Sequence, residues 1–243
     1  MSQQPPMVTV RADDPMVETV IRLEWDQFQR TDNEGGRAAC QGNWPMFHEM
    51  RLSQFLTWTP ALLASYENDL RQADRVGRNL VTEKYARMMA STTPDIYRER
   101  IEPYIPRLSA QRVARQEQVI ARQVAWAREF AGRWPALGEA MRVLTTAEDT
   151  PEQTSFETYL RGELGTYSDT TFDEYERLAA HITEQGGNLT EQTVRNTVRL
   201  EGYAGLDEAQ AAQARQAAAQ GANNQQGRQE PRNPQDSPSG AKA

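Results

Sequence analysis

Apolar residues recur at the three- and four-residue intervals of an α-helix over most of this 243-residue chain. The clearest case comes early, where Val17, Val20, Ile21 and Phe28 share one face of a helix. No sustained run alternates apolar and polar residues between hairpin-type turns, the pattern typical of half-buried strands. The sequence therefore predicts an all-α fold, a compact array of roughly eight to ten helices.

Capping residues, prolines and glycines indicate where these helices begin and end. Asp13 or Asp14 can cap the first helix, and Pro15 suits its first position, where a backbone N–H has no intrahelical acceptor. Gly186 and Gly187 are typical of a helix C-terminus, because glycine readily adopts the left-handed conformation found there. Short connections between such signals predict that successive helices lie antiparallel.

The composition changes along the chain predict one folded unit with two appendages. Residues 1–12 form a proline-containing lead-in that we expect to be flexible, and residues 13–205 form a single helical domain. Residues 206–220 are rich in Ala and Gln and could form a frayed helix. Residues 221–243 contain no large apolar side chain, so they cannot offset the entropy of ordering, and we expect a disordered C-terminal tail.

Charge and cysteine content limit the partners and the compartment. The net charge of -7 and the pI of about 5.1 disfavour nucleic acid and anionic membrane surfaces as partners. No stretch approaches the roughly 18 apolar residues of a membrane span, and the N-terminus lacks a secretory signal. A single cysteine excludes a disulfide framework within the chain, so we expect a cytoplasmic protein.

Three residues are candidates for chemistry. Glu24 lies on the apolar face of the first helix, where a carboxylate must be paired, protonated or bound to a ligand. Lys84 is the only lysine besides Lys242, and a desolvated lysine can act as a nucleophile or bind phosphate. Cys40 could be a nucleophile if a base lowered its pKa. Each also has a structural interpretation: an ion pair with arginine for Glu24, a salt bridge for Lys84 and a small buried thiol for Cys40.

A second group of polar residues is predicted to bind a ligand. Arginine and carboxamide side chains beside apolar helix faces, or beside a Gly-Gly loop, can recognise carboxylate or phosphate groups. We therefore expect an anionic small molecule as the partner and leave a protein partner open. Glu157 and Arg161, at an i, i+4 spacing, also fit a helix-stabilising pair. The predicted ligand-binding residues are Arg37, Gln41, Arg51, Gln54, Arg87, Glu157 and Arg161.

The sequence predicts no metal site and identifies no cofactor. The chain has two histidines, His48 and His181, and neither has a partner at metal-ligand spacing. It contains no HExxH motif and no ExxH motif of the di-iron kind. P-loop, GxGxxG and GxSxG motifs are absent as well.

Four long runs of sequence stand out: LEWDQFQRTDNEGGRAACQ, MRLSQFLTW, GRNLVTEKYARMMAST and TSFETYLRGELGTYSD. Together they resemble a bacterial family catalogued as domain of unknown function 4125, over residues 15 to about 205. The resemblance implies that the polar residues within these runs belong to the family's characteristic pattern, and that His48 and His181 do not. It implies no activity, substrate or catalytic residue.

Two hypotheses account for these residues. In the first, the helices enclose a pocket in which Glu24 acts as acid or base, arginines bind an anionic group, and Lys84 or Cys40 reacts. In the second, the same charges form buried salt-bridge networks in a structural or protein-interaction domain without catalysis. A pocket with unpaired charges would favour the first hypothesis, and complete pairing without a cavity would favour the second.

Overall fold

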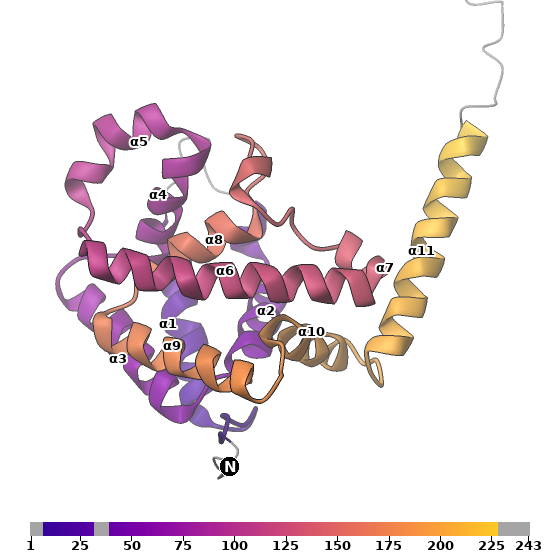
Figure 1. Ribbon diagram of the computed structural model, residues 1–243, viewed down its shortest axis with the longest axis horizontal. Helices are drawn as coiled ribbons and strands as arrows, with labels where there is room; N and C mark the ends of the chain where they lie inside the picture. Colours follow the sequence, from indigo (N-terminus) through magenta and orange to yellow (C-terminus); the bar gives the residue numbers. More distant parts are fainter. Residues whose placement is uncertain (1–6, 32–38, 228–243) are drawn as a thin grey trace, which may run out of the picture.

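The computed structural model describes the backbone of residues 7–31 and 39–227, and the side chains of residues 7–31 and 41–220. Over these residues it contains eleven α-helices, three short 3-10 helices and no strand, which confirms the predicted all-α class. Figure 1 shows the arrangement. The α-helices are α1 (Pro15–Gln29), α2 (Trp44–Phe55), α3 (Pro60–Arg75), α4 (Leu80–Thr92), α5 (Pro94–Arg100), α6 (Ala110–Arg133), α7 (Pro135–Glu139), α8 (Phe156–Leu164), α9 (Asp169–Glu184), α10 (Leu189–Leu200) and α11 (Leu206–Gly227). The 3-10 helices are η1 (Ala39–Gly42), η2 (Glu102–Tyr104) and η3 (Thr146–Glu148).

Local capping explains most helix boundaries. Eight α-helices begin with a side chain that accepts a hydrogen bond from a backbone amide of the first turn, each contributing about 1 kcal/mol. The capping residues are Asp14, Asn43, Thr59, Asn79, Ser109, Ser155, Ser168 and Asn188. After α9, Gly186 adopts a φ of 66° and Gly187 donates its amide to the carbonyl of Ile182, as the glycine pair predicts.

Helix α6 organises the packing of the domain. It crosses the molecule in Figure 1, with α8 against one side and α9 and α10 against the other. The main core joins α1, α2, α3, α4, α6, α8, α9 and α10 around fully buried residues such as Phe55, Trp58 and Phe172. A smaller cluster of Phe130, Val198 and Leu206 joins α6, α10 and α11.

Helix α11 begins inside the fold and then leaves it. Leu206 and Ala209 are buried near its start, and the helix then extends away from the body of the molecule (Figure 1). The Ala/Gln-rich segment 206–220 is therefore helical, and its first turn belongs to the core. The helix continues to Gly227, beyond the expected start of the tail, and residues 228–243 lie outside the described residues. No helix in the described ranges has the length and apolar character needed to cross a membrane.

Candidate functional site

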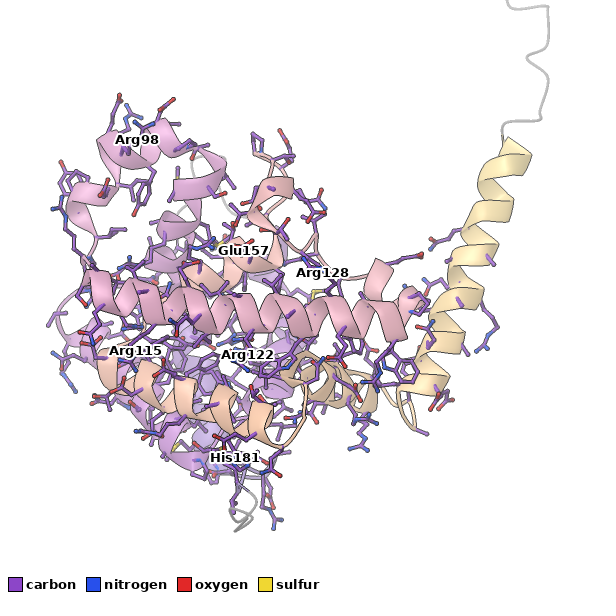
Figure 2. All side chains as sticks on the ribbon, in the orientation of Figure 1. Arg98, Arg115, Arg122, Arg128, Glu157 and His181 are labelled. Atoms are coloured by element: carbon purple, nitrogen blue, oxygen red, sulfur yellow. The ribbon has the colours of Figure 1, made fainter. Side chains whose placement is uncertain are left out.

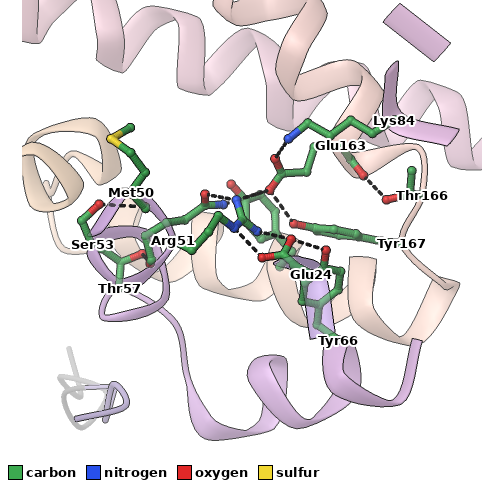
Figure 3. A network of polar contacts seen from close by, with 12 residues as sticks. Glu24, Met50, Arg51, Ser53, Thr57, Tyr66, Lys84, Glu163, Thr166 and Tyr167 are labelled. Atoms are coloured by element: carbon green, nitrogen blue, oxygen red, sulfur yellow. Dashed lines mark hydrogen bonds and ion pairs between the residues drawn. The ribbon is translucent and has the colours of Figure 1, made fainter. Parts of the chain in front are cut away.

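Four charged side chains from four helices meet in the interior. They are Glu24 from α1, Arg51 from α2, Lys84 from α4 and Glu163 from α8, and each is at most 9% exposed. Figure 3 shows that they point toward one another, and we call them the charge cluster. Because it joins two carboxylates with two cations, the cluster is electrically neutral overall. Its position explains why these charges lie on apolar helix faces.

Glu24 and Arg51 form the first ion pair of the cluster. Arg51 donates Nε to Oε2 of Glu24 at 2.5 Å and Nη2 to Oε1 at 2.7 Å, in the bidentate geometry that arginine favours. The hydroxyl of Tyr66, from α3, donates to Oε1 of Glu24 at 2.6 Å. The guanidinium of Arg51 also lies 4.7 Å from the ring centroid of Phe55. Both charges are therefore well compensated.

Glu163 accepts hydrogen bonds on both carboxylate oxygens. Oε2 accepts from the ammonium of Lys84 at 2.6 Å, whereas Oε1 accepts from Nε2 of Gln54 and the hydroxyl of Tyr167, both at 3.0 Å. Nη1 of Arg51 lies 3.5 Å from the same Oε1 and 2.7 Å from Oε1 of Gln54. These contacts connect the two ion pairs into one network.

Pairing keeps Glu163 and Lys84 ionised. Burial alone would raise the pKa of Glu163, but the charges of Lys84 and Arg51 outweigh it and hold that pKa well below its usual value. Burial alone would lower the pKa of Lys84, but the charge of Glu163 outweighs it and raises that pKa above the ordinary value. The Lys84 ammonium also lies 3.6 Å from the ring centroid of Tyr159. This environment favours a charged lysine over the neutral amine that nucleophilic attack requires.

Two cavities adjoin the charge cluster. A small one, of about 40 Å³, is lined by all four cluster residues and has room for water but not for a drug-sized molecule. A larger one, of about 430 Å³, lies on the α10 side of Glu163 and Gln54, and we call it the apolar cleft. Its apolar lining includes Met50, Trp58, Met141, Phe156, Leu160, Leu189 and Val194; its polar lining includes Gln54, Gln123, Arg142, Tyr159, Glu163, Tyr175 and several threonines.

The other predicted site residues lie elsewhere. Gln41 is buried and donates to the carbonyls of Phe28 and Thr31 at the end of α1. Arg87 lines a different cleft, beside the start of α6. Two further predictions, Arg37 and the side chain of Cys40, lie outside the described residues.

Glu157 and Arg161 form a separate polar network on α8, where Figure 2 labels Glu157. They pair with each other at 2.7 Å, in the i, i+4 arrangement that their spacing predicts. Arg161 also binds Glu117 of α6 through two hydrogen bonds, at 2.7 and 2.8 Å. This network is partly exposed and does not line the apolar cleft. It connects α8 to α6.

Glu163 of the charge cluster was not predicted as a site residue, and neither were Tyr66 and Tyr167, which donate hydrogen bonds to the carboxylates of the cluster. Glu163 carries the same signal as Glu24, since it follows Phe156 and Leu160 at spacings of seven and three on one helix. The two tyrosines carried no such signal in the sequence, because tyrosines on apolar helix faces are common in protein cores. In the described part of the chain, no three His, Cys, Asp or Glu side chains are grouped so that they could hold a metal ion.

The fold and the charge cluster define an all-α protein whose helices are joined by buried, balanced charges. The chain belongs to the family described as "Protein of unknown function (DUF4125)", whose model matches residues 14–211. The resemblance found in the four sequence runs is thereby confirmed. No curated protein and no solved structure shows significant similarity to the chain.

Proposed function

We propose that this protein binds a small molecule with an apolar body and an anionic end, and that the apolar cleft is the binding site. The observation that carries the proposal is the cleft itself, which combines a volume of about 430 Å³ with predominantly apolar walls. Ligand pockets in proteins typically have volumes of about 300–1,000 Å³ and few polar groups.

Hydrogen bonding inside the protein supports an apolar ligand body. Gln54 and Glu163, at the cluster end of the cleft, are engaged with Arg51, Lys84 and Tyr167. Gln123 donates to the hydroxyl of Tyr175 at 2.9 Å, and other polar groups in the lining have internal partners too. A ligand here gains more from burying apolar surface than from replacing these bonds.

Arg142 supports an anionic end on the ligand. It lines the apolar cleft and is exposed, with its guanidinium 4.7 Å from the ring centroid of Tyr159. Among the described residues, no carboxylate lies within ion-pair distance of Arg142. An anionic group at the cleft mouth could pair with this arginine and remain in contact with water.

The charge cluster, in this proposal, positions the wall of the cleft and takes no direct part in chemistry. Glu24 and Lys84 are paired and line the small cavity instead of the apolar cleft. The same pairing favours a second candidate function, a structural or protein-interaction domain whose cluster fixes helix register. The two candidates differ in whether the apolar cleft is occupied by a ligand.

A bulky residue at the cleft mouth is expected to block binding. Met50 of α2 lines the apolar cleft and is 54% exposed, so Met50→Trp adds volume there without removing a buried side chain. We expect the affinity for 1-anilinonaphthalene-8-sulfonate, an apolar probe with an anionic group, to fall at least about tenfold, equivalent to about 1.4 kcal/mol. Fluorescence titration measures this change.

Met46 offers a matched control on the same helix. It is 59% exposed and does not line the cleft, so Met46→Trp should leave probe affinity unchanged. Arg142→Gln should weaken the sulfonate probe but leave N-phenyl-1-naphthylamine, a neutral relative, unaffected. Equal affinity in wild type and Met50→Trp would contradict the proposed site, and the interaction domain would then be the better candidate.

A further inference from the structure

A second large cleft, separate from the apolar one, carries a concentration of arginines. It has a volume of about 460 Å³ and lies where the end of α3, α4, the start of α6 and the α8–α9 connection meet. Arg78, Arg87, Arg107 and Arg112 line it, and we call it the arginine cleft. It shares no lining residue with the apolar cleft, so the two are independent sites.

Ion pairing leaves the arginine cleft positively charged. Arg78 binds Glu83 through two hydrogen bonds of 2.7 Å, and Arg112 binds Asp169 at 2.9 Å. Two further arginines line the cleft, Arg87 and Arg107, but only one further acidic residue does, Asp69. Arg107 is exposed at the rim of the cleft.

Arg87 has unused hydrogen-bonding capacity. Its Nη2 donates to the carbonyl of Pro106 at 2.6 Å, but its Nε has neither a hydrogen-bond partner nor contact with solvent. In the described ranges, no carboxylate lies within ion-pair distance of it. Burial lowers the pKa of Arg87; the charge of Glu83 opposes this effect, whereas the charges of Arg78 and Arg112 add to it. An anion in the cleft would offset both the burial and the repulsion.

The most buried arginine of the cleft also has an unpartnered nitrogen. Arg112 is only 4% exposed, and its two Nη atoms donate to Asp169 and to the carbonyls of Leu164 and Tyr167. Its Nε has no hydrogen-bond partner. Buried donors without a partner are uncommon, and both of these belong to arginines that line the same cleft.

Two helices begin at the same cleft. Ser109 and Ser168, the N-caps of α6 and α9, both line it. The first amides of a helix have no intrahelical acceptor and carry partial positive charge, which favours anion binding. The arrangement therefore combines helix N-termini with guanidinium groups around one cavity.

Gly165 leaves room for Arg87 at the end of α8. A Cβ atom at Gly165 would lie 2.7 Å from Cδ of Arg87, closer than Cβ contacts normally come, and 3.2 Å from its Nε. The absence of that atom lets the arginine lie directly against the end of α8.

We propose that the arginine cleft binds the phosphate group of a small molecule. The phosphate contacts Arg87 and those amides at the starts of α6 and α9 that do not already donate to Ser109, Ser168 or Asp69, and Arg107 adds charge at the rim. The volume of the cleft leaves room for a larger organic portion beside the phosphate.

Calorimetric titration with inorganic pyrophosphate tests this assignment. We expect saturable binding to the wild-type chain, and a loss of about ten- to a hundredfold in affinity for Arg87→Met, because a hydrogen bond between two charged groups is lost. Methionine preserves the packing of the side-chain stem. Arg107→Gln, which alters an exposed residue, should weaken binding several-fold without affecting the fold.

Arg115 of α6 provides the matched control. It pairs with Asp173 and Glu176 of α9 and is not among the residues that line the cleft. Figure 2 labels it on α6. Arg115→Met should therefore retain wild-type affinity. Absence of saturable pyrophosphate binding would overturn the proposal, as would equal affinity in wild type, Arg87→Met and Arg107→Gln. Because the clefts are separate, pyrophosphate should not displace the naphthalene probe.

Discussion

Replacement of Glu163 by glutamine is expected to lower the free energy of unfolding by about 3–5 kcal/mol, because it leaves a buried cation uncompensated. Lys84 contacts Glu163 at 2.6 Å with only 11% of its side chain exposed, so it cannot recover full hydration. Glutamine preserves the shape of the residue and removes the charge. Urea denaturation followed by circular dichroism measures the loss.

Glu157 is the control for this experiment. It lies on the same helix and pairs with Arg161, but 24% of its side chain and 33% of that of Arg161 are exposed. Glu157→Gln is expected to cost at most about 1 kcal/mol, because solvent screens a partly exposed pair. Similar losses for the two variants would contradict a special role for the charge cluster.

A double variant separates the ion pair from other effects of the substitution. Lys84→Met combined with Glu163→Gln removes both partners, so neither charge is left buried alone. We expect the double variant to be more stable than the sum of the single losses predicts, by about 1–3 kcal/mol. Additive losses would mean that Lys84 and Glu163 do not stabilise each other.

Replacement of Gly162 by alanine is expected to lower the free energy of unfolding by about 1–3 kcal/mol, the usual cost of overpacking. A Cβ at this position in α8 would lie 2.8 Å from the carbonyl oxygen of Lys84 and 2.8 Å from Cγ of Met88. Helices α4 and α8 would have to separate, which would also disturb the Lys84–Glu163 contact. Urea denaturation measures the change.

Gly132 is the matched control, because it also lies within an α-helix. A Cβ there would meet nothing within 4 Å, so Gly132→Ala should stabilise the protein by up to about 1 kcal/mol through helix propensity. The two alanine substitutions are therefore expected to have opposite signs. A gain in stability for Gly162→Ala would show that α4 and α8 are not packed as described.

The fold was predictable because its determinants are local. Asp14 accepts a hydrogen bond from the amide of Met16, and Pro15 follows it directly, so the start of α1 depends on adjacent residues alone. The end of α9 at Gly186 is equally local. The length of α11 was harder to predict. Only Leu206 and Ala209, near its start, contact the core, and the rest of the helix has a composition that resembles a linker.

The candidate site was predictable only in part. A charged residue on or beside an apolar face indicates burial, and this reasoning found Glu24 and Arg51, whereas Lys84 was found because lysine is rare in this chain. It could not find which charges pair, because Arg51 and Glu163 are separated by 112 residues and meet only through tertiary packing. The residues predicted to bind one anion lie in different parts of the structure. Arg51 pairs with Glu24, whereas Arg87 lines the arginine cleft.

Lys84 and Glu163 are ionised and paired within the buried charge cluster. Lys84 and Lys242 are the only lysines, so selective ¹⁵N labelling of lysine gives at most two ammonium signals in NMR spectra. Because pairing with Glu163 raises the pKa of Lys84, its ammonium signal should exchange slowly with water and keep the charged chemical shift up to about pH 10.4, the ordinary lysine pKa. In Glu163→Gln this slowly exchanging signal should disappear. Deprotonation of Lys84 below pH 10.4 in the wild-type chain, or rapid exchange of both ammonium groups, would contradict the claim.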